Sequence, residues 1–179
     1  MPSPIAHSVA GYLLAKSLPA DRFSENRIQK WSLYIFYASL IAVVADLDFI
    51  PQFVTGNAYH RGITHSLVFA LGFSAISALI VSVWKKFSYI KIFTLTSIFY
   101  GSHLLLDYFS YGRGIKLFLP FVDRFFRSPI ILFPGLHYSR GLFHISHLLP
   151  IGFEIAISIL GIGVVWWWKK SKARKNIEV

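Results

Sequence analysis

Residues 45–66 contain two polar motifs around which the rest of the chain is organised. Residues 45–51 read Ala-Asp-Leu-Asp-Phe-Ile-Pro, and residues 60–66 read His-Arg-Gly-Ile-Thr-His-Ser. The first motif closes a long apolar run, and the second opens the next one. Carboxylates and imidazoles are costly to place near hydrocarbon, so acids and histidines beside two apolar segments predict a functional site.

The composition indicates a membrane protein. Of the 179 residues, 55% are hydrophobic and 17% are aromatic, whereas soluble domains are roughly 45–50% apolar. The net charge of +10 would favour nucleic-acid binding in a soluble protein, but Lys and Arg flanking membrane segments explain it better. We therefore expect the lipid bilayer as a partner and no specific nucleic acid.

Five apolar segments occur along the chain, at about 4–18, 31–50, 66–84, 88–109 and 147–168. A membrane-spanning helix needs roughly 20 residues, and about 17 can suffice. The last segment ends in three Trp residues followed by two Lys residues, which is typical of a helix end near lipid headgroups. The sequence predicts an all-α, polytopic helical membrane protein with about five membrane-embedded helices in a single domain over residues 1–170.

The distribution of Lys and Arg predicts the orientation of these segments. If the C-terminus is cytoplasmic, twelve of the 18 basic residues lie on the inner side and six on the outer side, as the positive-inside rule favours. All seven histidines then lie on the outer side. We expect a multi-pass protein of the cytoplasmic (inner) membrane with its site near the outer face and a basic cytoplasmic tail at residues 171–179.

Two pairs of residues at segment ends are candidates for chemistry. His103 and Asp107 are four residues apart, so they lie on one helical face and can reach one ion. A structural hydrogen-bonded pair is the alternative, but an Asp within an apolar segment favours a metal or catalytic role. Asp46 and Asp48 are two residues apart and would diverge on a regular helix.

Pro51 bears on what the two acids of the first motif can do. It disfavours helix at the residue before it, so the chain can unwind here. Both carboxylates can then point into one site, or one can bind a metal while the other orients a histidine. Two solvated acids at a helix end are the alternative.

The second motif supplies two histidines and an arginine. His60 and His65 are five residues apart across Gly62, which suits a loop residue followed by a residue in the first turn of the next helix. Arg61 cannot bind a metal, but its guanidinium matches the oxygens of a phosphate. An interfacial anchor is the alternative for Arg61. Together with Arg113, it is our candidate for binding an anionic substrate.

Three further residues are weaker candidates. His7 lies near the start of the first segment, where a surface or capping role is common, and the predicted topology places it with the other histidines. His147 and Glu154 are seven residues apart and share a helix face, so we take them as second-tier ligands or as groups behind the ligands. Glu154 lies in an apolar segment and needs a partner, which a nearby His or Arg could supply for structural reasons alone.

The available donors point to a divalent metal. The chain has no cysteine, so ligands must come from His, Asp, Glu or water, which suits zinc, manganese, iron or magnesium. Such a metal lowers the pKa of a bound water to about 7 and polarises the bond under attack. No Gly-x-Ser-x-Gly motif supports a serine hydrolase. Two other functions stay open: a metal or ion transporter, and a non-catalytic scaffold in which the metal only ties helices together.

Four motifs, in this order, resemble a known family. Met-Pro-Ser-Pro-Ile-Ala-His-Ser at the N-terminus, the two motifs of residues 45–66 and Ser-His-Leu-Leu-Leu-Asp-Tyr at residues 102–108 are similar to those of the membrane-bound metal-dependent hydrolases. This family is also described as LexA-binding, inner-membrane-associated hydrolases. Residues 114–120 resemble the Gly-x-x-x-Leu-x-Pro step that follows in the family.

The resemblance implies a small helical membrane protein with a hydrolase site. It points to these metal ligands: His7, Asp46, Asp48, His60, His65, His103 and Asp107. The family is distantly similar to zinc-dependent C-type phospholipases and related nucleases, whose His-x-x-x-Asp pair is matched by residues 103 and 107. Their second pair, His-x-x-x-Glu, is absent here.

These features predict a membrane-bound, metal-dependent hydrolase of phosphoesters, with a phospholipid headgroup as one candidate substrate. The expected metal is Zn²⁺, with Mn²⁺ as an alternative. The catalytic candidates are Asp46, Asp48 and Arg61: one Asp as a ligand, the other as the base, and the guanidinium as a phosphate contact. Arg113 is a second candidate contact for the substrate phosphate.

Overall fold

The computed structural model describes residues 2–18, 27–57, 59–135 and 145–175, and these residues form an all-helical fold. The α-helices are α1 (Pro4–Ser17), α2 (Arg27–Ile41), α3 (Phe49–Thr55), α4 (Leu67–Lys85), α5 (Tyr89–Tyr108) and α6 (Leu148–Lys175). Short 3-10 turns are η1 (Val44–Asp48), η2 (Ile63–His65) and η4 (Ile145–His147). In the described part of the chain, β contacts are limited to two isolated bridges between residues 110–133. The all-α prediction is confirmed.

Local sequence signals set the starts of α1 and α4. Ser3 caps α1 by accepting a hydrogen bond from the backbone N–H of Ala6, and Pro4 occupies the first turn, where its missing N–H costs nothing. Ser66 caps α4 in the same way by accepting from Phe69 N. Because a side-chain cap satisfies one of the unpaired N–H groups at a helix start, both helices begin within one residue of the predicted positions.

The second apolar segment is not the continuous helix predicted from residues 31–50. Helix α2 ends at Ile41, and the chain bends by 48° before η1 and α3. Pro51 was predicted to end the helix, but it is the third residue of α3, which continues to Thr55. The N–H groups of the first helical turn have no partner within the helix, so proline is tolerated there.

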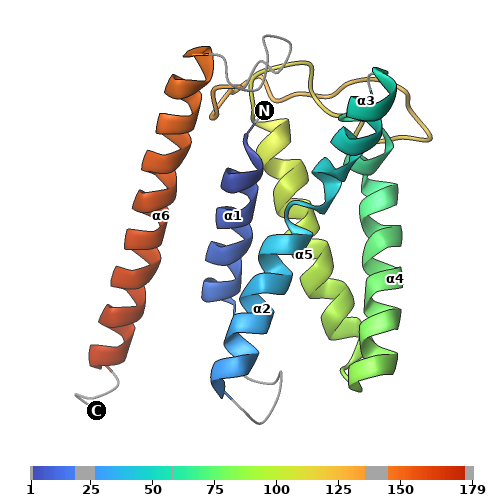
Figure 1. The fold of residues 1–179 in the computed structure, drawn as a ribbon. Coiled ribbons are helices and arrows are strands. Elements are labelled where there is room, and N and C mark those ends of the chain that lie inside the picture. Colours follow the sequence, from blue (N-terminus) through green and yellow to red (C-terminus); the bar gives the residue numbers. More distant parts are fainter. Residues whose placement is uncertain (1, 19–26, 58, 136–144, 176–179) are drawn as a thin grey trace.

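The helix ends that carry polar residues lie at the same end of the molecule. Figure 1 shows the start of α1, α3, the start of α4, the end of α5 and the start of α6 together, with the loop that follows α5 crossing over them. The C-terminal end of α6 lies at the opposite end (Figure 1). This shared end was predicted from the alternation of the segments, and it is what brings the two motifs near the end of α5.

Close packing between helices depends on small side chains. Helix α1 packs against α2, α5 and α6, and α4 packs against α5. An ideal Cβ on Gly11 would lie 2.5 Å from the carbonyl oxygen of Ala38, so only glycine allows α1 and α2 to approach this closely. The fully buried Ala15, Ala38 and Ala42 continue the same contact region. Large apolar side chains are instead exposed along α4 and α6, as expected of surfaces that face lipid.

Two helices are long and apolar enough to cross a bilayer: α4, and the stretch Ile145–Lys172 that contains most of α6. The bent pair Ser32–Ile41 and Val44–Thr55 would make a third span. Helix α1, with 14 residues, is about 21 Å long, which is less than the roughly 30 Å of a bilayer core. By length and composition the described residues therefore contain two or three spans, and about five membrane-embedded helices stays a prediction. Helix α6 also continues beyond the predicted end at Trp168 to Lys175.

Candidate metal site

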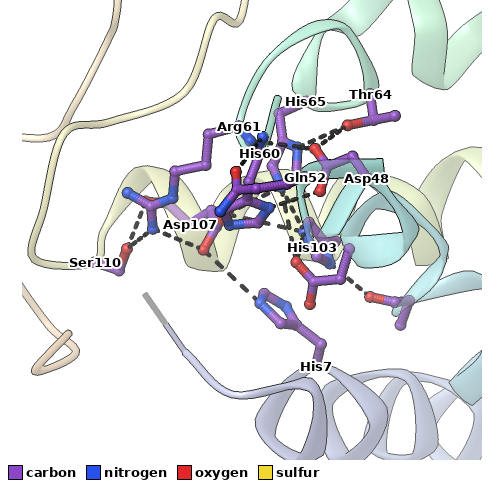
Figure 2. A network of polar contacts seen from close by, with 12 residues as sticks. His7, Asp48, Gln52, His60, Arg61, Thr64, His65, His103, Asp107 and Ser110 are labelled. Atoms are coloured by element: carbon purple, nitrogen blue, oxygen red, sulfur yellow. Dashed lines mark hydrogen bonds and ion pairs between the residues drawn. The ribbon is translucent and has the colours of Figure 1, made fainter. Parts of the chain in front are cut away.

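Eight of the polar residues singled out above form one buried cluster where η1, η2, α1 and α5 meet. Each is at most 7% exposed, and Figure 2 shows most of them converging around the histidine rings. The members are His7, Asp46, Asp48, His60, Arg61, His65, His103 and Asp107. Burying this many ionisable groups together is favourable only if they are paired or bind an ion, so the contacts of each carboxylate show what the cluster can do.

Asp48 orients two histidines. Its Oδ1 lies 2.6 Å from His60 Nδ1, and its Oδ2 lies 3.2 Å from His65 Nδ1. Oδ2 also accepts hydrogen bonds from the Thr64 hydroxyl at 2.6 Å and from the Arg61 backbone N–H at 3.2 Å. Both oxygens are therefore engaged by the protein. A carboxylate that accepts Nδ1–H directs the opposite nitrogen of each ring toward the site, as in carboxylate–histidine–metal arrangements.

His103 is oriented by the main chain. Its Nδ1 lies 2.8 Å from the carbonyl oxygen of Ala42, and a carbonyl can only accept, so Nδ1 carries the hydrogen. In the neutral ring Nε2 then holds a lone pair. The bend after α2 exposes this carbonyl, because Ala42 lies beyond the last residue of the helix. The break in the predicted helix thus frees the Ala42 carbonyl to orient the His103 ring.

Four side-chain atoms converge on one point. His65 Nε2 lies 3.1 Å from His103 Nε2 and 3.2 Å from Asp107 Oδ2. Asp46 Oδ1 lies 3.6 Å from His103 Nε2 and 3.9 Å from His65 Nε2, and Asp107 Oδ2 lies 3.9 Å from His103 Nε2. The edges of a tetrahedron around zinc with nitrogen and oxygen ligands are about 3.3–3.6 Å long. The measured separations bracket that range.

Several of these atoms lack hydrogen-bond partners within the described residues. Both carboxylate oxygens of Asp46, Oδ2 of Asp107 and both ring nitrogens of His7 are buried without one. Oδ2 of Asp107 comes within ion-pair distance of His65 but makes no hydrogen bond. Buried unpaired acceptors are costly and call for an explanation such as an ion. The residues present fit a divalent cation bound by two imidazoles and two carboxylates.

His7 extends the cluster on the side of α1. Its ring stacks on that of His103 with centroids 3.8 Å apart, and its Nε2 lies 3.8 Å from Asp107 Oδ1. Two separate sets of three potential ligands result, since the donor atoms of His7, His103 and Asp107 lie within 4.8 Å of one another. Those of Asp46, His60 and His65 do so as well.

Arg61 contacts Asp107 inside the protein. One guanidinium nitrogen lies 3.1 Å from Asp107 Oδ1 and 2.7 Å from the Ser110 hydroxyl. The backbone of Arg61 is left-handed, with φ of 66°, an uncommon conformation for a residue other than glycine. Gly112 leaves room for the side chain, because an ideal Cβ there would lie 3.1 Å from the guanidinium. The structure thus places Arg61 behind Asp107, holding one carboxylate oxygen while the other faces the imidazoles.

The two histidines of the second motif differ in charge. Burial lowers the pKa of His60 despite the neighbouring Asp48 carboxylate, so this ring is neutral at neutral pH. Burial also disfavours the charged form of His65, but its contacts with the carboxylates of Asp107 and Asp48 outweigh that effect and raise its pKa to about 9. A proton and a metal ion compete for the same nitrogen of His65, because a metal binds only the lone pair.

The remaining candidates lie elsewhere. Glu154 accepts a hydrogen bond at 2.9 Å from the backbone N–H of Ser3, which ties α6 to the start of α1. Neither Glu154 nor His147 belongs to the two sets of potential metal ligands. Arg113 donates to the carbonyl oxygen of His60 at 2.9 Å and is exposed on the loop after α5. His137 and His144 lie outside the described residues.

Three supporting residues were not anticipated. Ser110 binds Arg61, Gln52 accepts from the His60 backbone N–H at 2.9 Å, and the Tyr100 hydroxyl donates to the Thr64 carbonyl at 2.7 Å. Ser110 follows Asp107 by three residues, which is the one signal in the sequence that pointed to it. The other two act through the backbone, and nothing in their spacing indicates that.

Comparison with known proteins identifies the family. Residues 1–173 match the family model described as YdjM inner membrane protein. The chain is 28% identical over 153 residues to inner membrane protein YbcI of Escherichia coli (strain K12), an alignment that covers 76% of this chain and 84% of that protein. No solved structure matches it. The matching names state an inner membrane location and specify neither a reaction nor a metal. With nearly its whole length matched, the chain belongs to the YdjM family of inner membrane proteins.

Proposed function

We propose that this protein is a membrane-bound, metal-dependent hydrolase that acts on phosphoesters. One observation carries the proposal: Nδ1 of His65 and Nδ1 of His103 each lie against an oxygen atom, so Nε2 of both rings faces a point shared with Asp46 and Asp107. His65, His103, Asp46 and Asp107 would hold the cation, with Zn²⁺ preferred and Mn²⁺ as the alternative, since both accept nitrogen and oxygen ligands. When bound, such a metal activates water and polarises a phosphoryl oxygen.

The protein's own contribution is to orient groups and to accept a proton. Asp48 holds His60 through Nδ1 at 2.6 Å, which leaves Nε2 of this neutral ring as the acceptor nitrogen. Stacking on Phe49, with ring centroids 3.8 Å apart, fixes the plane of the ring. We assign the general base to the His60–Asp48 pair, because a neutral, oriented imidazole is the usual proton acceptor near neutral pH. Asp46, whose two oxygens have no hydrogen-bond partner in the described residues, is then the carboxylate that would bind the cation.

The first test is metal content. Protein purified in detergent without chelator is expected to carry zinc or manganese in at least equimolar amount by plasma mass spectrometry. Treatment with EDTA is expected to abolish hydrolysis of bis(p-nitrophenyl) phosphate, and added Zn²⁺ or Mn²⁺ to restore it. Metal-free protein that cannot be loaded would contradict the metal site. Stoichiometric metal without turnover of any phosphoester would contradict the enzyme.

Asp48→Asn tests the orienting role separately. The amide keeps the size of the side chain but cannot accept from both imidazoles, so metal affinity is expected to fall about 10–100-fold, the usual cost of losing a group that orients a ligand. Competition with a chelating dye measures this. Asp123→Asn is the matched control, because that carboxylate is 67% exposed, pairs with Lys116 and belongs to neither set of potential metal ligands. Unchanged metal affinity in the Asp48 variant would contradict the assignment.

A structural metal is the second candidate function. The four converging side chains are almost completely buried, and closed four-ligand sites are typical of metals that stabilise a fold. In that case EDTA would lower the unfolding temperature, and no phosphoester would be turned over with metal present. Transport has less support, because Asp46, Asp48 and Asp107 gather at one level instead of following a path through the bilayer. Metal uptake into vesicles without turnover would favour it.

A further inference from the structure

A cavity of about 820 Å³ adjoins the cluster on the side of α3 and α4. Asp48 and His60 form the part of its wall that it shares with the cluster. The rest of the lining comes from η1, Pro51 of α3, residues 59–64, the start of α4 and the loop after α5. The cavity thus reaches His60, whose donor atom lies within 4.8 Å of those of Asp46 and His65.

Basic side chains line the part of the cavity formed by the loop after α5. Arg113 and Lys116 both lie on the ring of Phe125, at 4.5 and 5.3 Å from its centroid. Lys116 also pairs with the exposed carboxylate of Asp123. Arg113 forms no ion pair with a carboxylate in the described part of the chain. Two neighbouring cations, one without a carboxylate, favour an anion such as a phosphate.

Apolar side chains line the part of the cavity that lies along α4. Phe69 and Phe73 lie one turn apart on α4, and Leu47 and Val44 from η1 add to the apolar lining. Helix α4 is one of the candidate membrane spans, and Phe73 lies about 9 Å along it from its first residue. The cavity therefore combines a cationic part at the loop with an apolar part that extends down a spanning helix.

We propose that this cavity binds an anionic phospholipid. Its phosphate would lie between Arg113 and Lys116, next to His60, and its acyl chain would lie along Phe69 and Phe73. The inference rests on the proposed function and names its substrate class: a lipid-borne phosphoester instead of a water-soluble one. A soluble phosphoester would use the cations but would leave the apolar lining unoccupied.

Photolabelling of EDTA-treated protein tests the inference apart from metal and turnover. The protein is placed in phosphatidylcholine nanodiscs that contain phosphatidic acid with a diazirine on one acyl chain. Labelled peptides are expected from residues 44–51 and from the first turns of α4. Unlabelled phosphatidic acid is expected to compete, and millimolar glycerol 3-phosphate is not. Labelling spread over all membrane-facing helices, or equal competition by glycerol 3-phosphate, would overturn the lipid site.

Charge variants provide the matched comparison. Arg113→Gln with Lys116→Gln is expected to weaken labelling of these peptides about tenfold or more, since contacts between charged groups are lost. Arg124→Gln, an exposed arginine of the same loop that does not line the cavity, is expected to leave labelling unchanged. An equal effect of both variants would overturn the site. Site-specific labelling of a protein that neither loads metal nor turns over a phosphoester would refute only the hydrolase, and phosphoester turnover without site-specific labelling would refute only the lipid inference.

Discussion

Asp107→Ala is expected to abolish stoichiometric metal binding and to lower the free energy of unfolding by about 3–5 kcal/mol. The carboxylate is completely buried and lies between the guanidinium of Arg61 at 3.1 Å and the ring nitrogen of His65 at 3.2 Å. Removing it leaves the buried positive charge of Arg61 without its partner, which is the costly way to break a buried ion pair. Thermal unfolding of EDTA-treated protein in detergent measures the structural part of this effect, because no metal contributes there.

A second substitution isolates the ion pair. In the double variant Asp107→Ala with Arg61→Met, the uncompensated charge is gone, so the loss of stability is expected to be smaller than in the single Asp107 variant. Such non-additivity is the mark of two residues in direct contact. Asp123→Ala, at an exposed carboxylate, is expected to change the unfolding temperature little. An equal loss in the single and double variants would show that Arg61 does not depend on Asp107.

His103→Ala is expected to reduce metal affinity by more than about 100-fold, because loss of a ligand costs more than loss of a group that orients one. Phosphoester hydrolysis is expected to fall with it, since the ring is fully buried and shares the convergence point with His65, Asp46 and Asp107. Equilibrium dialysis against Zn²⁺ measures the affinity. Added imidazole is expected to restore part of both metal binding and activity by filling the space left by the side chain.

His147→Ala is the control for this variant. His147 is also a buried histidine, at the end of η4 directly before α6, but it belongs to neither set of potential ligands. Metal affinity is expected to stay within about twofold of the parent protein, the usual scatter of effects away from a site. Equal losses of metal in the two variants would show that histidine substitutions disturb the fold in general and would contradict the special role of position 103.

Much of the helical architecture could be predicted, because a long apolar segment indicates a helix that is buried in lipid or in the protein core. Four of the five segments became helices with nearly the predicted starts, including α5 with its His103 and Asp107 pair. Because successive helices run in opposite directions, the ends that carry His and Asp residues were also expected to lie on the same side. Unwinding near Asp46 and Asp48 was predicted from Pro51, but the end of α2 at Ile41 was not, because residues 42–45 (Ala-Val-Val-Ala) are as apolar as the helix before them. Pro51 suggested a break some residues too late.

The residue types and spacing of the two motifs determined which groups are available for chemistry: imidazoles and carboxylates without thiols, at one set of helix ends. Only the tertiary structure decided which of these groups face the proposed metal position and which orient other side chains. In the 3-10 turn η1, Asp48 contacts Nδ1 of His65 while Asp46 lies on the side of Nε2, although the two acids are equivalent in the sequence. Arg61 lies behind Asp107, while Arg113 lines the cavity. The physical reason is that a side chain's role depends on which nitrogen or oxygen it meets, and those partners come from elements far apart in the chain.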